Sequence, residues 1–90
     1  MAPSAHQLQV SVVSADAEVW SGEATQVVAR TTEGEIGILS GHEPVLAVLA
    51  AGEVRVTTAG GEVVTANAED GFLSVQADTV TIVAGTAALV

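Results

Sequence analysis

Residue types that could do chemistry gather between Ser40 and Glu43. A serine near a histidine is part of the apparatus of nucleophilic catalysis, and His42 followed by Glu43 offers two groups that could ligate a metal. Ser40 and His42 lack a positioned third group, however, and the chain contains no GxSxG nucleophile elbow. The other histidine, His6, is distant in the sequence. We therefore expect no catalytic centre and no metal site, and a small metal-dependent hydrolase stays open only because His42 and Glu43 are adjacent.

The glycine-rich run GEIGILSG, residues 34–41, does not form a nucleotide-binding loop. Its glycines, Gly34, Gly37 and Gly41, do not have the GxGxxG spacing, and no GxxxxGK[ST] phosphate loop occurs elsewhere. The chain also contains no lysine, which excludes carriers that attach biotin or lipoate to a lysine and enzymes that form a Schiff base. We therefore expect no bound cofactor and no enzyme activity.

Charge restricts the partners of the chain. Eleven acidic residues accompany only Arg30 and Arg55, for a formal net charge of -9. Such a surface repels phosphate backbones and anionic lipid headgroups, so we expect no nucleic acid and no direct lipid insertion, whereas a basic protein partner would suit it. No apolar run approaches the roughly 20 residues of a transmembrane helix, and the first residues do not resemble a secretory signal. The sequence indicates a soluble chain.

Ninety residues, of which 49% are hydrophobic, are expected to form one domain, residues 1–90, because a chain of this length supports a single apolar core. The absence of cysteine removes disulfides and favours a reducing, cytosol-like compartment. Trp20 and Phe72 are the only aromatic residues, so the core must consist mostly of Val, Ala, Leu and Ile. We interpret Trp20 as an apolar plug at one end of the fold or, alternatively, as an interface anchor.

Alternation of apolar and polar residues predicts strands with one wet face. The expected strands include residues 8–12, 25–31, 53–58, 62–66, 72–76 and 79–82. Strands that recur at intervals of about ten residues favour an antiparallel sandwich or barrel over an α/β fold. Arg30 and Arg55 are then expected on strand faces, in contact with some of the acids.

Local sequence also predicts turns. Gly60-Gly61 predicts a type I′ hairpin turn with both glycines at positive φ, so the strands on either side should pair. Ala77-Asp78 predicts a second tight turn, and Glu69-Asp70 a solvated one. The run PVLAVLAAG, residues 44–52, is compatible with a short helix that Pro begins and Gly ends, or with a buried strand. Periodicity leaves both alternatives open.

The stretch EGEIGILSGHEPVL, residues 33–46, concentrates glycines and acids beside a proline and a histidine, which predicts either a demanding bend in a sheet or a surface shaped for a partner. Its pattern EGE-φ-GI-xxGHxP-φ-L, where φ is apolar, resembles the epsilon subunit of F-type ATP synthases in its N-terminal β-sandwich domain. VVSADAEVWSGEATQVVA, residues 12–29, and GFLSVQADTVTIVA, residues 71–84, resemble other segments of the same family. The resemblance covers nearly all of the chain, in order.

This resemblance implies a ten-stranded antiparallel β-sandwich, or flattened barrel, in which residues 44–51 form a strand. It implies a non-catalytic subunit of the central rotor stalk, which binds the gamma subunit and the ring of c subunits and couples ion-driven rotation to ATP synthesis. Such a subunit lies peripherally at the cytoplasmic face of the bacterial plasma membrane. Family members usually continue into a C-terminal helical hairpin, which would begin at AALV, so inhibition of ATP hydrolysis and nucleotide sensing are not assigned to these residues.

The resemblance also assigns contact residues. Glu33, Gly34 and Glu35 are expected near the polar loops of the c ring, and acids there suit loops that present arginine. The residues expected to meet the gamma subunit are Gly41, His42, Glu43, Pro44 and Val45. The alternative is a free-standing acidic β-sandwich module that binds a small ligand or peptide. It requires a concave apolar pocket at the same loop, whereas a rotor subunit predicts a flat surface.

Overall fold

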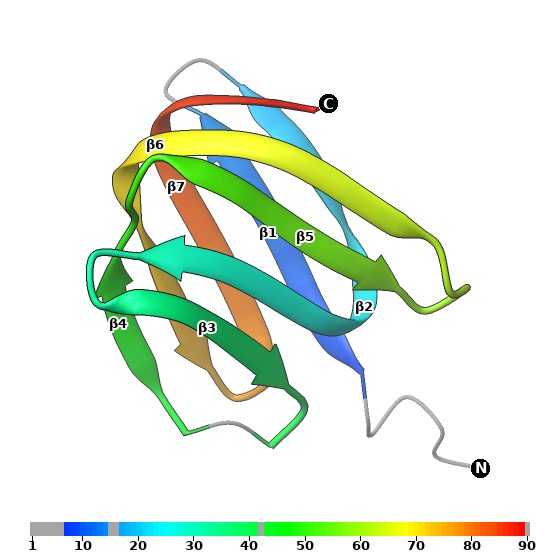
Figure 1. The fold of residues 1–90 in the computed structure, drawn as a ribbon. Coiled ribbons are helices and arrows are strands. Elements are labelled where there is room, and N and C mark those ends of the chain that lie inside the picture. Colours follow the sequence, from blue (N-terminus) through cyan, green and yellow to red (C-terminus); the bar gives the residue numbers. More distant parts are fainter. Residues whose placement is uncertain (1–6, 15–16, 42, 90) are drawn as a thin grey trace, which may run out of the picture.

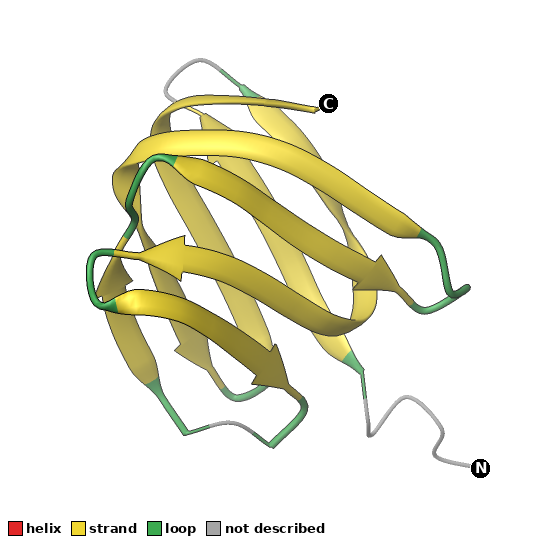
Figure 2. Ribbon diagram, in the orientation of Figure 1, coloured by secondary structure: helices red, strands yellow, loops and turns green. Residues whose placement is uncertain are grey.

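The computed structural model describes residues 7–14, 17–41 and 43–89, and within them the chain is all β (Figure 1). Its strands are β1 (Leu8–Ser14), β2 (Glu18–Thr31), β3 (Gly34–Leu39), β4 (Val45–Val48), β5 (Gly52–Thr58), β6 (Val63–Gln76) and β7 (Thr79–Leu89). No helix occurs in this part of the chain (Figure 2), and β4 takes its place in the ambiguous run after Pro44. The all-β prediction is confirmed.

Two layers of strands enclose the core, and the long strands pass from one layer to the other (Figure 1). One layer places β1, β7, β6 and β4 side by side, and the other places β6, β5, β2 and β3 side by side. The first part of β2, from Glu18 to Ala24, pairs with β1 and so connects the two layers. From Gln26 onward β2 pairs with β3 instead. The result is a flattened barrel in which β3 and β4 have no ladder between them.

The described residues form seven strands rather than the ten that the family resemblance implied, and the merging of two expected strands accounts for one of the missing three. The expectation separated residues 62–66 from residues 72–76 by a turn at Glu69-Asp70, whereas residues 63–76 form the single strand β6. β6 bends at Asp70, whose φ is 60°, and keeps the same register on β7 on both sides of the bend. A strand that bends at one left-handed residue looks in sequence like two strands and a turn, because acids are frequent in both.

One pairing departs from the expected antiparallel arrangement. β1 and β7 lie parallel, with Val10 beside Val80 and Val12 beside Ile82. A parallel pair needs a long connection between its strands, and here nearly the whole chain supplies it. Alternation within a strand identifies its buried face but gives no information about the direction of its neighbour.

The core is aliphatic, as the composition required. Its largest fully buried side chains are Leu8, Ile38, Leu73, Ile82, Val10, Val12, Val27, Val54, Val56, Val75 and Val80. They alternate along their strands with more exposed residues, as expected for strands with one wet face. Trp20 is half-buried against this core and lies over Gly22, where a Cβ atom would approach the indole ring to 3.0 Å. This position agrees with the plug interpretation of Trp20.

The two tight turns form where the sequence placed them. The β5–β6 pairing is confirmed, but its loop is not type I′: only Gly61 has positive φ, and the amide of Gly61 donates to the Thr58 carbonyl at 2.9 Å. The Thr58 amide donates to the Glu62 carbonyl at 2.7 Å, which makes a three-residue loop ending in a left-handed glycine. Between β6 and β7, Ala77 and Asp78 both have positive φ, at 50° and 61°.

Candidate functional site

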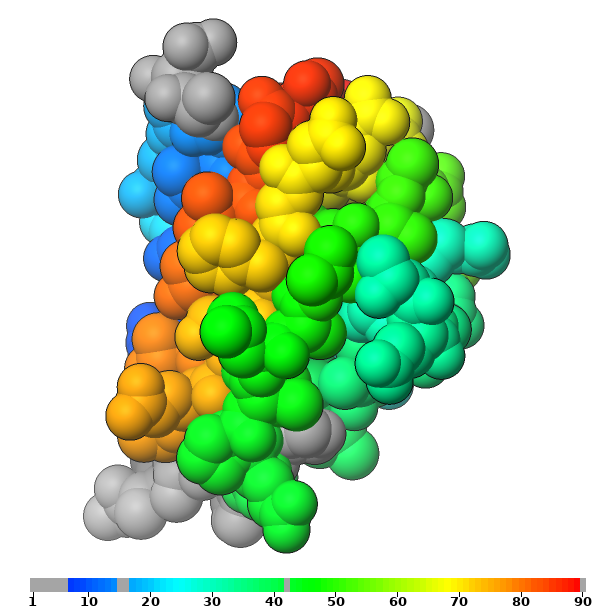
Figure 3. Space-filling model, turned by 90° about the vertical axis from the view of Figure 1, so that its left-hand side faces the viewer, coloured from blue at the N-terminus to red at the C-terminus, as the bar shows by residue number. Residues whose placement is uncertain are grey.

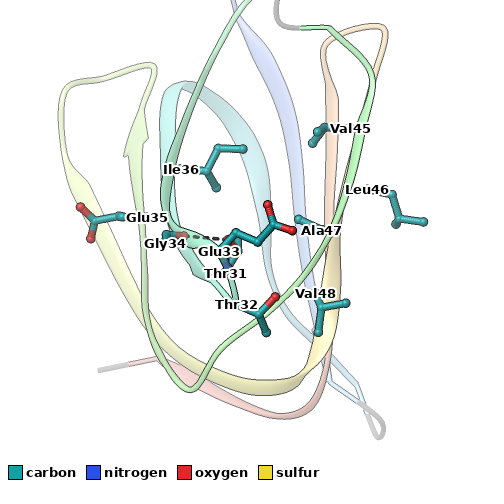
Figure 4. Close-up of a pocket in the computed structure, with 10 residues that line it drawn as sticks. All are labelled: Thr31, Thr32, Glu33, Gly34, Glu35, Ile36, Val45, Leu46, Ala47 and Val48. Atoms are coloured by element: carbon teal, nitrogen blue, oxygen red, sulfur yellow. Dashed lines mark hydrogen bonds between the residues drawn. The ribbon is translucent and has the colours of Figure 1, made fainter.

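The turn between β2 and β3 presents two of the predicted c-ring residues at its tip. Thr31 is buried, and its hydroxyl donates to the Gly34 carbonyl at 2.7 Å and accepts from the Glu33 amide at 3.2 Å (Figure 4). Gly34 has a φ of 117°, a conformation that residues with a Cβ atom rarely adopt. The turn therefore holds its backbone rigidly while the side chain of Glu33 stays exposed.

Glu35 lies just beyond this turn, on the exposed face of β3 opposite Arg30 of β2. Its Oε2 accepts a hydrogen bond from Nη2 of Arg55 at 3.3 Å, in an ion pair whose side chains are 55% and 48% exposed. Exposed pairs of this kind contribute about 0 to 1 kcal/mol. The predicted contact of Arg55 with an acid is confirmed, and a partner could take over the Glu35 carboxylate at little cost in stability.

The predicted gamma contact begins in the loop after β3, which Asp78 anchors. Asp78 Oδ1 accepts from the Gly41 amide at 2.7 Å, and Asp78 Oδ2 accepts from the Ser40 hydroxyl at 2.9 Å. The Asp78 carbonyl also accepts from the Gln9 amide of β1 at 2.8 Å. One residue of the β6–β7 turn thus fixes the start of this loop against two other elements. Nothing in the sequence pairs Asp78 with Ser40, and sequence reasoning missed it.

The rest of the predicted gamma contact lies on or beside β4. His42 lies outside the described residues. Glu43 and Pro44 are exposed, and Val45, the first residue of β4, is half-buried. The structure therefore presents the described members of this set on the surface, next to an edge strand.

An exposed apolar surface continues from Val45 along β4. Leu46 and Val48 are 74% and 60% exposed, and Phe72, which pairs with Val48 across β4 and β6, is 42% exposed. Together with Ala47 they line an apolar hollow. Sequence reasoning missed this surface because β4 contains only apolar residues, so no polar position marked its outer face. The signal was present in the chain as the alternation of Leu46 and Val48 with smaller, half-buried neighbours.

A cleft of about 430 Å³ separates β3 from β4, lined by residues 31–36 and 45–48. We call it the β3–β4 cleft. Figure 3 shows it as an open furrow beside β4 on the surface of the molecule. Figure 4 shows Ile36 and the Glu33 side chain directed into it, whereas Glu35 points away. The surface at this loop is therefore not flat, contrary to what the rotor interpretation predicted.

The two predicted contact sets flank β3, one at the β2–β3 turn and one after Leu39, but Val45 of the second set lines the same cleft as Glu33, Gly34 and Glu35. β3 has six residues, so its ends are five steps apart, roughly 17 Å at about 3.3 Å per residue. Glu33–Glu35 stand at one end, and Gly41–Val45 follow the other. Two different partners could therefore be contacted at once.

Within residues 7–14, 17–41 and 43–89, no three His, Asp or Glu side chains gather as possible ligands of a metal ion. The same described part of the chain holds no helix long and apolar enough to cross a membrane.

Comparison with protein families identifies one match. Residues 7–90 match the family described as ATP synthase, Delta/Epsilon chain, beta-sandwich domain. The ATP synthase epsilon chain of Micrococcus luteus is 54% identical over 83 residues, covering 92% of this chain and 91% of that one. The ATP synthase epsilon chain of Streptomyces avermitilis is 54% identical over 70 residues, covering 78% of this chain and 56% of that one.

Solved structures give the same result. A chain in the cryo-EM structure of the Euglena gracilis mitochondrial ATP synthase, OSCP/F1/c-ring in rotational state 1, superposes with a TM-score of 0.86 at 28% identity. The alignment covers 92% of this chain and 53% of that one. The chain thus spans about half of the length of the Streptomyces and Euglena proteins and most of the length of the Micrococcus protein.

Proposed function

The chain belongs to the ATP synthase delta/epsilon β-sandwich family, and from this premise we propose that it is a non-catalytic subunit of the central rotor stalk of a membrane-bound F-type ATP synthase. It binds the gamma subunit and the ring of c subunits and couples ion-driven rotation to ATP synthesis. In a bacterial cell this places it peripherally at the cytoplasmic face of the plasma membrane.

The proposal is supported by the positions of the residues assigned to the two partners, which flank β3 at the β2–β3 turn and in the loop after β3. A subunit that couples two rotor components must hold both at a fixed separation. Here the spacer is a strand whose inward side chain Ile38 is fully buried. The ends of the spacer are fixed by the Thr31 hydroxyl at one turn and by Asp78 at the other loop.

The c-ring contact is assigned to Glu33, Gly34 and Glu35. Glu33 is exposed at the turn, whose backbone is held by the buried Thr31, and Glu35 is exposed just beyond it on β3. In a chain with a net charge of -9, a partner loop that presents arginine would be attracted to this end of β3. On docking, the Glu35 carboxylate exchanges its intramolecular partner Arg55 for a cation of the loop, and the modest strength of the exposed pair permits this exchange.

The gamma contact is assigned to Gly41, His42, Glu43, Pro44 and Val45, and it continues onto the apolar surface of β4. Exposed apolar side chains that adjoin one another are typical of protein interfaces. Leu46, Val48 and Phe72 form such a group directly beside Val45. We therefore assign the apolar part of the interface to gamma and the acidic part to the c ring.

The test compares Glu35→Ala with Glu62→Ala, its matched control. Glu62 is also an exposed acid, but it lies in the β5–β6 loop, remote from β3 (Figure 1). We expect Glu35→Ala to weaken binding to purified c ring by about 1 to 3 kcal/mol, the range of an interface anchor. Binding of the gamma subunit should be unchanged in both variants.

Two results would contradict the proposal. Equal c-ring affinity of Glu35→Ala and Glu62→Ala removes the assignment of the c-ring site. Failure of the wild-type chain to bind gamma while it is folded removes the rotor function itself, and would favour the ligand-binding module that the β3–β4 cleft could serve.

A further inference from the structure

β4 is an uncovered strand edge. It pairs with β6 on one side, and among the described residues its other side has no strand partner along Val45–Val48. β3 is likewise paired only with β2. The β2–β3 turn meets β4 where the Thr32 amide donates to the Val48 carbonyl at 3.0 Å, and β3 and β4 run on from there along the two sides of the β3–β4 cleft (Figure 1, Figure 3).

The hydrogen bonds at this junction show which backbone groups face the cleft. The Leu49 amide donates to the Gly71 carbonyl of β6 at 2.9 Å, whereas the Val48 carbonyl accepts from Thr32 on the opposite side. In an antiparallel ladder, backbone groups of successive residues point alternately to the two sides of the strand. The amide and carbonyl of Leu46 therefore face the cleft, and among the described residues neither has a hydrogen-bond partner.

β3 repeats this arrangement on the other wall. The Arg30 carbonyl accepts from the Ala50 amide at 3.0 Å, so the backbone groups of Arg30 do not point to its β3 neighbour Glu35. By the same alternation, the backbone groups of Glu35 and Gly37 point away from β2 and toward the cleft. Among the described residues, backbone groups without a strand partner thus border the cleft on both sides.

The two walls differ in how far they protect an exposed edge. Natural sheets protect their edges with charged residues, prolines, bulges, short strands or covering segments. β3 carries Glu35, whereas β4 is short and follows Pro44 but carries no charged residue, and its outer side chains Leu46 and Val48 are apolar and exposed. An edge of this kind favours pairing with another chain.

We propose that β4 is extended by one strand of a partner chain, which pairs through its backbone with Leu46 and fills the β3–β4 cleft. The partner strand carries apolar side chains that pack on Leu46, Val48 and Phe72 beside the cleft. This inference rests on the proposed function, since the strand belongs to the partner that binds the adjoining residues Gly41–Val45, the gamma subunit.

Charge distinguishes this partner from a second copy of the chain. Two copies that each carry a net charge of -9 repel one another, and each would bring another Glu33 to the same cleft. A basic segment of a different protein is attracted to the same place. We therefore assign the β3–β4 cleft to a strand of a different protein.

The test separates backbone pairing from side-chain contact. Leu46→Ala removes the exposed side chain and keeps the amide, whereas Leu46→Pro removes the side chain and also the amide that faces the cleft. Leu46 stands opposite Ser74 in the β4–β6 ladder, but its backbone groups point away from β6 and its side chain lies outside the core, so thermal unfolding should show both variants folded. We expect Leu46→Pro to bind the purified gamma subunit at least about tenfold more weakly than Leu46→Ala, because a pairing hydrogen bond is lost and the strand can no longer approach.

Hydrogen exchange of the unsubstituted chain gives an independent test of the backbone pairing. The Leu46 amide should exchange hydrogen rapidly in the free chain and become protected in the complex with gamma. A complex in which this amide stays unprotected, or equal affinities of the two variants, overturns the inference and leaves the proposed function standing. Protection that appears on self-association without gamma overturns the choice of partner, and the absence of any complex with gamma removes the proposed function as well.

Discussion

Substitution of Asp78 tests the hydrogen bonds that position the start of the predicted gamma contact. The Asp78 carboxylate accepts hydrogen bonds from the Gly41 amide at 2.7 Å and the Ser40 hydroxyl at 2.9 Å, across 37 and 38 residues of sequence. Because Asp78 has a φ of 61°, replacement by Ala would add backbone strain to the loss of the carboxylate. Asp78→Gly is the cleaner change, since glycine adopts this conformation freely.

The magnitude follows from the two hydrogen bonds. A hydrogen bond to a charged group contributes about 1.5 to 3 kcal/mol, and the lower end applies here because Asp78 is only half-buried. We therefore expect Asp78→Gly to lower the free energy of unfolding by about 2 to 3 kcal/mol. A domain of this size is stable by about 5 to 13 kcal/mol, so the loss is a large fraction of the total.

Asp78→Asn is the matched control. Asparagine tolerates the left-handed conformation and offers an oxygen to Gly41 and an amide group to Ser40, but it carries no charge. Its cost should be about 1 kcal/mol. Urea denaturation of the three proteins, followed by the fluorescence of Trp20, gives the free energies directly.

The reasoning is refuted if Asp78→Gly is as stable as the unsubstituted chain, or if Asp78→Asn is as unstable as Asp78→Gly. A double-mutant cycle with Ser40→Ala measures how much the hydrogen bond between Ser40 and Asp78 contributes to the free energy of unfolding. A coupling energy near zero between Asp78 and Ser40 would show that the 2.9 Å contact contributes nothing.

Two further predictions concern the β6–β7 pair. Gly71→Ala should destabilise the chain by at least about 3 kcal/mol in urea denaturation, because the new Cβ atom would clash with the Val83 carbonyl oxygen. Gly37→Ala is the control, since a Cβ atom there would meet nothing within 4 Å. Equal stability of the two variants would contradict the structure. Ala77→Gly should raise the free energy of unfolding by up to about 1 kcal/mol, because Ala77 has a φ of 50°, and a lower denaturation midpoint would argue against a left-handed residue there.

Local features of the fold were predictable from sequence. Alternation located the buried faces of β1, β5 and β7, because each of these strands has polar residues on its outer face. The β5–β6 pairing followed from Gly60-Gly61, since the turn residues lie between the strands that they join. Its loop type did not follow, because two adjacent glycines are compatible with several turns.

Features that depend on distant residues were not predictable in the same way. The continuity of β6 through Asp70 and the parallel pairing of β1 with β7 are set by neighbours far along the chain. For the candidate site, the acidic turn was found from its motif, whereas Asp78 and the apolar surface of β4 were missed. The carboxylate of Asp78 acts on a loop that precedes it by more than thirty residues, and β4 has no polar residue to mark its outer face.

The parallel β1–β7 pair has a consequence for how the molecule forms. Among the described strands β1 is synthesised first and its neighbour β7 last, so the ladder from Gln9 to Ser14 can close only after the five strands between them have been made. Contacts this distant in sequence must overcome a large loop-closure entropy, which makes folding slow, in the range of roughly milliseconds to seconds. We expect a cooperative folding transition without a stable half-molecule, since cleavage between β5 and β6 would separate β1 from β7 and leave it paired with β2 alone.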